Sequence, residues 1–125
     1  WTVAIDTPNE DAAERDLLRT LTLQNQALAT SGNYRKYRID EKGNKYVHTI
    51  NPFDGTAQPS KVLSASVIAA DCMTADAYAT ALMSMPISKI ETLPLDGIEY
   101  MLVLDGDNGN YDIQRSPGFP SLNLP

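Results

Sequence analysis

The stretch from residue 62 to residue 85 constrains the fold more than any other part of this chain. Val62 to Ala70 contains no charged residue and is rich in small and β-branched side chains, which predicts a strand buried on both faces. Thr74 to Met85 carries apolar residues around nearly its whole circumference and is followed by Pro86, which predicts a helix that ends there. We therefore expect this strand and helix to lie in the protein interior.

Alternating apolar residues and turn-forming residues predict a mostly antiparallel sheet around this centre. Strands are expected at the N-terminus and around Leu21 and Leu23, and a short surface helix is expected from Ala12 to Thr20, with a second one from Ser88 to Thr92. Two hairpins are expected, one formed by residues 34–39 and 45–50 and the other by residues 99–104 and 111–115. The fold class is therefore α+β, with one buried helix and one or two surface helices, in one domain that spans residues 1–125.

The charge pattern limits the partners that the chain can bind. Its net charge of −6 argues against a general nucleic-acid surface. Half of the basic residues nevertheless fall in one short stretch, which is either a solvated hairpin face or an anion-attracting patch beside a phosphate site. These residues are Arg35, Lys36, Arg38, Lys42 and Lys45.

Two further sequence features bear on compartment and metal sites. No run approaches the roughly 18 apolar residues of a transmembrane segment, and any export signal would have to lie upstream of Trp1. Cys72 is the only cysteine, which excludes an internal disulfide and a site with several cysteine ligands.

Asp76 is the only charged residue between Cys72 and Ser88. A carboxylate inside an apolar helix requires a basic partner, hydrogen bonds from backbone amides, or a metal ion. Thr80 lies one turn later on the same side, and a carboxylate with a hydroxyl forms an oxygen-only pair that suits Mg²⁺. The alternative is that Asp76 only lies near the helix start and interacts favourably with the helix dipole. The spacing alone leaves both interpretations open.

Two other segments carry groups that could take part in chemistry. His48 is the only histidine, at the end of a predicted strand, where it could act as a general base or be a structural side chain. The segment from Ala29 to Gly32 combines two hydroxyls and a glycine in a predicted loop. Its backbone amides could bind phosphate or a ring carbonyl, although many ordinary turns have the same composition.

Four segments, in order, resemble the C-terminal half of ApbE-type flavin transferases. Trp1–Ile5 followed by Pro8 is similar to the strand that opens that half. The other three are Ala27-Leu28-Ala29-Thr30-Ser31-Gly32-Asn33-Tyr34-Arg35, His48-Thr49-Ile50-Asn51-Pro52-Phe53-Asp54-Gly55, and the run from Val67 to Leu82 that contains Asp71-Cys72-Met73-Thr74-Ala75-Asp76-Ala77-Tyr78-Ala79-Thr80-Ala81.

The resemblance implies the C-terminal portion of a T-fold-like domain and a magnesium-dependent reaction. FAD would be cleaved, AMP released, and FMN attached to a Thr or Ser of a partner flavoprotein. Asp76 and Thr80 would bind Mg²⁺, and His48 would be the base. The residues against the flavin nucleotide would be Thr30, Ser31, Gly32, Tyr34, Asn51 and Pro52. The resemblance also implies a periplasmic location or one on the outer face of the cytoplasmic membrane, with a parent protein anchored by an N-terminal lipid.

The chain departs from the family pattern in the loop that follows His48. Asn51 replaces the usual aspartate and can still cap the turn, whereas Phe53 and Asp54 replace the usual basic residue and threonine. The family's N-terminal half, which supplies much of the FAD pocket, has no counterpart in these 125 residues. These differences leave open a second function, a non-catalytic flavin-binding or interaction module of the cell envelope.

Overall fold

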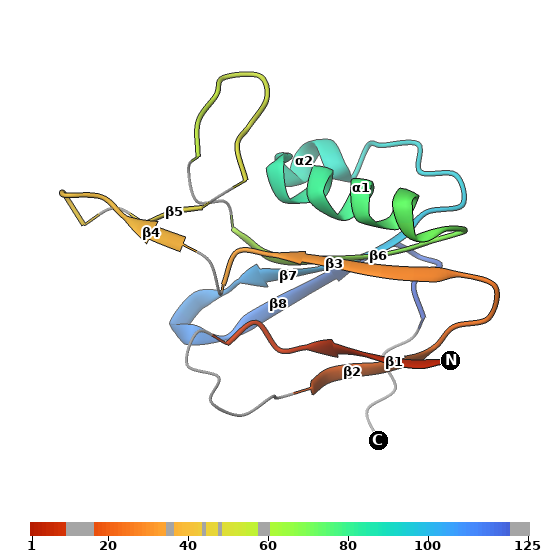
Figure 1. The fold of residues 1–125 in the computed structure, drawn as a ribbon. Coiled ribbons are helices and arrows are strands. Elements are labelled where there is room, and N and C mark those ends of the chain that lie inside the picture. The colour runs from red at the N-terminus through yellow and green to blue at the C-terminus, as the bar shows by residue number, and fades with distance from the viewer. Residues whose placement is uncertain (10–16, 35–36, 44, 48, 58–60, 121–125) are drawn as a thin grey trace.

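The computed structural model describes residues 1–9, 17–34, 37–43, 45–47, 49–57 and 61–120. Within these ranges the chain forms three layers, with helices on one face of a central sheet and a separate strand pair on the other (Figure 1). In chain order, the elements are β1 (Thr2–Asp6), β2 (Leu17–Thr22), β3 (Ala27–Gly32), β4 (Tyr37–Ile39), β5 (Lys45–Val47), β6 (Val62–Ala69), α1 (Cys72–Ser84), α2 (Ile87–Ile90), β7 (Glu99–Asp105), the 3-10 turn η1 (Asp107–Gly109) and β8 (Tyr111–Arg115).

The central sheet has the strand order β3-β6-β7-β8, and every neighbouring pair is antiparallel. β6 lies in the interior of this sheet and is covered by side chains on both faces, as the sequence predicts. The α+β fold class and the predominantly antiparallel sheet are therefore confirmed.

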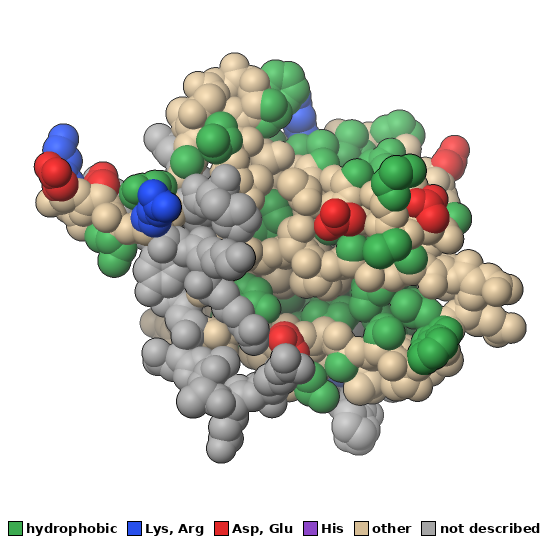
Figure 2. Space-filling model, viewed as in Figure 1, with side chains coloured by type: hydrophobic (Ala, Val, Ile, Leu, Met, Phe, Trp, Pro, Cys, Tyr) green, Lys and Arg blue, Asp and Glu red, His purple; other side chains and the backbone are tan. Residues whose placement is uncertain are grey.

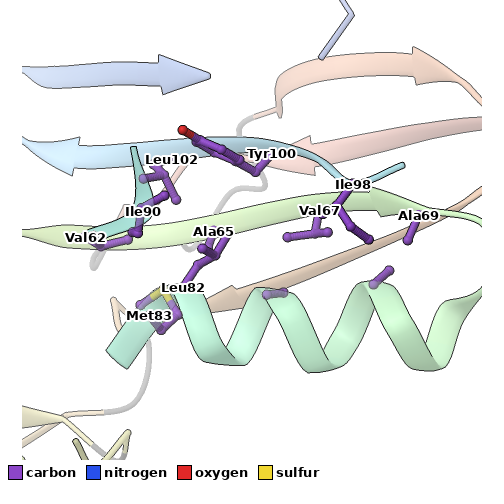
Figure 3. Close-up of a cluster of buried hydrophobic side chains, with 12 residues drawn as sticks. Val62, Ala65, Val67, Ala69, Leu82, Met83, Ile90, Ile98, Tyr100 and Leu102 are labelled. Carbon is purple, nitrogen blue, oxygen red and sulfur yellow. The ribbon is translucent and has the colours of Figure 1, made fainter. Parts of the chain in front are cut away.

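The helix layer covers one face of the sheet. Ala75, Ala79, Leu82 and Met83 of α1 pack against a row of β6 and β7 side chains, and Ile90 of α2 joins the same cluster (Figure 3). The row consists of Val62, Ala65, Val67, Ala69, Tyr100 and Leu102. Alanine at the contact positions of α1 lets the helix approach the sheet closely. This close approach sets the distance between the exposed side of α1 and the strands β3 and β6.

The β1–β2 pair covers the other face. Ile5, Leu21 and Leu23 pack against side chains that point away from the helices, and Phe119 near the C-terminus closes the same cluster. The side chains contributed by the sheet are Ile68, Met101 and Val103. Because β6 sends alternate residues into both clusters, a strand without charged residues is the only kind that fits there.

Two predicted hairpins and the second helix are confirmed with small shifts in their bounds. β4 pairs with β5, and β7 pairs with β8, both in antiparallel register. The predicted helix at 88–92 is observed as α2, which begins one residue earlier and ends two residues earlier. In the part of the chain that the structure describes, no helix is both long and apolar enough to cross a membrane.

The helix expected from Ala12 to Thr20 is wrong over residues 17–20, which belong to strand β2. Residues 12–16 lie outside the described residues. Ile5 pairs with Arg19 and Ala4 with Thr20, so the backbone hydrogen bonds of this segment go to β1. Pairing with β1, which is distant in sequence, outweighs the weak helical preference of a short polar segment.

The expectation of a fully buried α1 is also wrong. Only one side of the helix is buried, and Met73 (80% exposed), Asp76, Ala77, Tyr78 and Thr80 lie on the exposed side. Hydrophobic and acidic side chains therefore meet at the surface over α1 (Figure 2). Alanine and methionine occur on both sides of the helix, so the sequence could not show which side would be covered.

Candidate functional site

The Thr30-Ser31-Gly32 segment lies at the end of strand β3 and not in the loop that was expected. Its side chains therefore point to opposite faces of the sheet. On the helix side, the hydroxyl oxygens of Ser31 and Thr80 lie 3.4 Å apart. On the opposite side, Thr30 Oγ1 lies 2.8 Å from Ser66 Oγ. The structure thus brings Ser31, but not the Thr30 side chain, to Thr80, one of the two candidate metal residues.

Asp76 and Thr80 project from the exposed side of α1 into solvent. Asp76 is therefore not a carboxylate trapped in an apolar interior, and burial gives no reason for a counter-cation. Among the described residues, no group of three or more histidine, cysteine, aspartate or glutamate side chains could hold a metal ion. What remains is the chemistry of the donors: two side-chain oxygens one helical turn apart, with the Ser31 hydroxyl beside one of them.

The start of α1 is fixed by Asp71, a residue that the sequence reasoning missed. Its Oδ1 accepts a hydrogen bond from Thr74 N (2.8 Å), and its Oδ2 accepts one from Thr74 Oγ1 (2.9 Å). These two bonds lower the pKa of the Asp71 carboxyl, and the bond from the backbone N–H of Thr74 has the larger effect. The first turn of α1 contains no acidic residue, so Asp71 and not Asp76 is the acid at the helix start. An Asp-x-x-Thr spacing before the helix was the available signal.

β3 is an edge strand of the central sheet, since β6 is its only sheet neighbour among the described residues. Alternate backbone N–H and C=O groups of an edge strand point away from the sheet and can bind a ligand or another strand. A group lying along this edge could contact the backbone of residues 30–32 and the Ser31 side chain together. The edge geometry therefore suits nucleotide contacts through the backbone.

Gly32 allows the close approach of Tyr34. A Cβ atom placed on Gly32 would lie 2.6 Å from Tyr34 Cε1, closer than any ordinary contact. The Tyr34 ring therefore packs directly over the Gly32 backbone, at the point where the candidate nucleotide strand ends. A larger residue at position 32 would have to displace the Tyr34 ring, so glycine is favoured here by space and not by an unusual φ angle.

Asn51 and Pro52 lie in a tight turn next to α1. Asn51 Oδ1 accepts a hydrogen bond from Phe53 N (2.9 Å), so the replacement for the family's aspartate does cap the turn as expected. Asn51 N donates to Thr56 O (2.8 Å), and Gly55 N donates to Asn51 O (2.8 Å). The Asn51 side-chain oxygen is therefore committed to the loop itself.

Asp54 has a structural role in the same turn. Its Oδ1 accepts hydrogen bonds from Thr56 N (2.9 Å) and Thr56 Oγ1 (2.7 Å), and these bonds lower the pKa of the Asp54 carboxyl. The carboxylate that stands in place of the family's threonine is therefore held at a fixed position on the loop.

A buried asparagine joins the nucleotide strand to this loop. Asn33 follows Gly32 directly, its backbone N donates to Leu63 O (3.0 Å), and its Oδ1 accepts a long hydrogen bond from Thr49 Oγ1 (3.5 Å). His48, the predicted base, lies outside the described residues, as do Arg35 and Lys36 of the basic cluster. Arg38 and Lys42 of that cluster are exposed on the β4–β5 hairpin. This exposure agrees both with a solvated hairpin face and with an anion-attracting patch.

Comparisons with known proteins agree with this arrangement. The model of the ApbE family matches residues 1–102. The chain is 32% identical over 123 residues to an FAD:protein FMN transferase of Vibrio cholerae, which covers 98% of this chain and 36% of that protein. It also superimposes on the ApbE protein of Thermotoga maritima with a TM-score of 0.72 (30% identity, 94% of this chain, 36% of that chain). The TM-score with the flavin transferase ApbE of Vibrio cholerae is 0.73 (29% identity, 95% of this chain, 36% of that chain).

The chain therefore spans about a third of the length of the relatives that it matches. The family model covers more than half of the 125 residues, and the likeness of the fold extends over nearly all of them. Both comparisons single out the family to which the β3, α1 and loop motifs point. The chain belongs to the ApbE family.

Proposed function

We propose that this chain supplies the C-terminal part of a magnesium-dependent FAD:protein FMN transferase, which cleaves FAD, releases AMP and joins FMN to a Thr or Ser of a partner flavoprotein. The observation that carries the proposal is the 3.4 Å approach of the Ser31 and Thr80 hydroxyls. It brings the proposed flavin segment of β3 next to the proposed metal pair of α1, two segments that are far apart in the sequence. Family membership supplies the reaction class.

Asp76 and Thr80 would hold the Mg²⁺ ion. Magnesium accepts one or two protein oxygens and completes its shell with water and phosphate oxygens, so an exposed carboxylate and hydroxyl one turn apart fit it. Bound Mg²⁺ would neutralise the charge on the pyrophosphate. The exposure of both side chains is consistent with this role, because the remaining ligand positions must be reached by the nucleotide.

The other residues have positioning roles in this proposal. The edge of β3, with Thr30, Ser31 and Gly32, would bind the flavin nucleotide mainly through its backbone, and Tyr34 would border it. The loop that begins with Asn51 and Pro52 would form the neighbouring wall. His48 would accept the proton of the acceptor hydroxyl, so that the oxygen can attack the FMN phosphorus as AMP leaves.

The test uses the full-length protein that carries these residues, with FAD, Mg²⁺ and a candidate acceptor flavoprotein, and measures AMP release and the mass of the acceptor. We expect Asp76→Asn and Thr80→Val to abolish Mg²⁺-dependent AMP release. Both side chains are exposed, so the melting temperature should change by no more than about 2 °C. Asp107→Asn, the same chemical change at the exposed β7–β8 turn, is the matched control.

Binding of FAD without AMP release by the unmodified protein, with every acceptor tried, would favour the alternative, a non-catalytic flavin-binding module. The Asp54 carboxylate in place of a family hydroxyl is the observation that favours this alternative. Full activity in the Asp76→Asn protein would show that the metal pair is assigned wrongly.

A further inference from the structure

The loop between β5 and β6 exposes a large aromatic side chain beside a cation. Phe53 is 86% exposed, and Lys89 Nζ of α2 lies 5.2 Å from the centroid of its ring. The loop projects on the helix side of the sheet, next to α2 (Figure 1), and hydrophobic side chains lie at its surface (Figure 2). Lys89 lies over the ring, and the high exposure of Phe53 leaves ring surface that a second aromatic group can contact.

The turn that carries Phe53 is preformed. The three hydrogen bonds of Asn51, to Phe53 N, Gly55 N and Thr56 O, close the turn that contains Phe53. Gly55 has a φ of 69°, which glycine adopts without strain. A side chain that is held on a rigid turn loses little conformational entropy when a partner binds, which is how anchor residues at interfaces work.

A hollow of about 220 Å³ lies between this turn and the end of α1. It is lined by Thr49, Asn51, Asp54, Thr56, Met83, Ser84, Met85 and Pro86. Among the described residues, both hydrogen bonds to the Asp54 carboxylate use Oδ1, and Oδ2 can accept from a further donor. The last turn of α1 contains no basic residue, so the negative end of the helix dipole at this hollow is not balanced by its own side chains.

The charges at the hollow select the kind of ligand. A carboxylate and a helix C-terminus favour an ammonium or guanidinium group and disfavour the phosphates of a dinucleotide. The charged part of the hollow is therefore suited to a cationic side chain of the polypeptide substrate and not to the phosphates of FAD. Thr49, which lines the hollow, directly follows the proposed base His48 in the sequence.

We propose that Phe53, Lys89 and this hollow form a docking patch for the acceptor polypeptide, which places an aromatic side chain on the exposed ring surface of Phe53 and a Lys or Arg side chain in the hollow. The proposal rests on the proposed function, because that reaction has a polypeptide as its second substrate. Phe53 and Asp54, two of the three departures from the family pattern, are then the residues that set acceptor specificity in this chain.

The test measures binding to the full-length protein that carries these residues, by fluorescence anisotropy and by amide shifts in NMR spectra. The probes are two short synthetic peptides that share one threonine and one tryptophan and differ only in one arginine or glutamate. We expect the arginine peptide to bind about fivefold or more tightly than the glutamate peptide and to shift the amides of residues 49–56 and 83–86.

Two variants and two matched controls decide the assignment. Phe53→Ala should weaken the arginine peptide about threefold or more, and Asp54→Asn, which keeps the acceptor for Thr56, should remove the preference for arginine. Ile39→Ala, at another exposed apolar residue, and Asp107→Asn should change nothing. Equal affinity for the two peptides, absence of binding, or the same losses in the controls would overturn the proposal.

The outcome is separable from that of the proposed function. Peptide binding requires neither FAD nor AMP release, so a patch that binds the arginine peptide in a protein without transferase activity refutes the function alone. Conversely, an active transferase whose rate and peptide affinity are the same in Phe53→Ala and Asp54→Asn refutes the patch alone.

Discussion

Two buried serines on β6 should respond in opposite directions to the same substitution. Ser64 is 1% exposed, and its Oγ has no hydrogen-bond partner within the described part of the chain. Ser66, two residues later on the same face, is 0% exposed and its Oγ lies 2.8 Å from Thr30 Oγ1. We expect Ser64→Ala to stabilise the fold and Ser66→Ala to destabilise it.

The magnitude follows from the hydrogen bonds. A buried hydroxyl without a partner costs about 1–3 kcal/mol, and a satisfied hydrogen bond contributes about 1 kcal/mol net. Each substitution removes one oxygen from a packed interior, so the packing loss is similar in the two variants and cancels in their comparison. The free energy of unfolding of Ser64→Ala should therefore exceed that of Ser66→Ala by at least about 2 kcal/mol.

The assay is urea unfolding followed by circular dichroism, with thermal melting as a second measurement. For a chain of 125 residues, 2 kcal/mol corresponds to a difference of about 8 °C in melting temperature. Equal m-values would show that only the stability has changed. If Ser64→Ala unfolds at or below the midpoint of Ser66→Ala, the assignment of Ser64 as the unsatisfied residue is incorrect.

Two other predictions concern α1. Because the folded-state pKa of Asp71 is lowered from 3.8, the stability that its cap contributes is present above that value and is lost as the pH falls through the folded-state pKa. At pH 7 the melting temperature of Asp71→Ala should therefore be below that of the unmodified chain. In strong acid the two melting temperatures should become equal. A difference in melting temperature that does not change with pH would contradict the charged cap. Leu82→Ala should lower the free energy of unfolding by about 2–5 kcal/mol because Leu82 is fully buried. Met73→Ala, on the exposed side of the same helix, should change it by no more than about 0.5 kcal/mol. Similar losses in both variants would contradict the one-sided packing of α1.

The sequence was sufficient where the signal is local. The uncharged run of β6, the stop at Pro86 and the turn residues of the β7–β8 hairpin each act within a few residues, and the structure confirms all three elements. The order of the four motifs likewise identified the ApbE family before any contact was known. Local patterns of this kind are determined by backbone sterics and side-chain periodicity, which a single segment carries by itself.

Distant contacts decided the rest. Ser31 and Thr80 are 49 positions apart, and only the packing of α1 on β3 and β6 brings their hydroxyls together. The same packing placed Asp76 at the surface, because small alanines on one side of α1 contact the sheet, and the sequence offered alanines on both sides. In the register of β3 with β6, the Thr30 side chain lies on the face of the sheet opposite to that of Ser31. The sequence determined which elements form and the family to which they belong. Tertiary packing determined which side chains meet, because burial depends on what covers a surface and not on the segment alone.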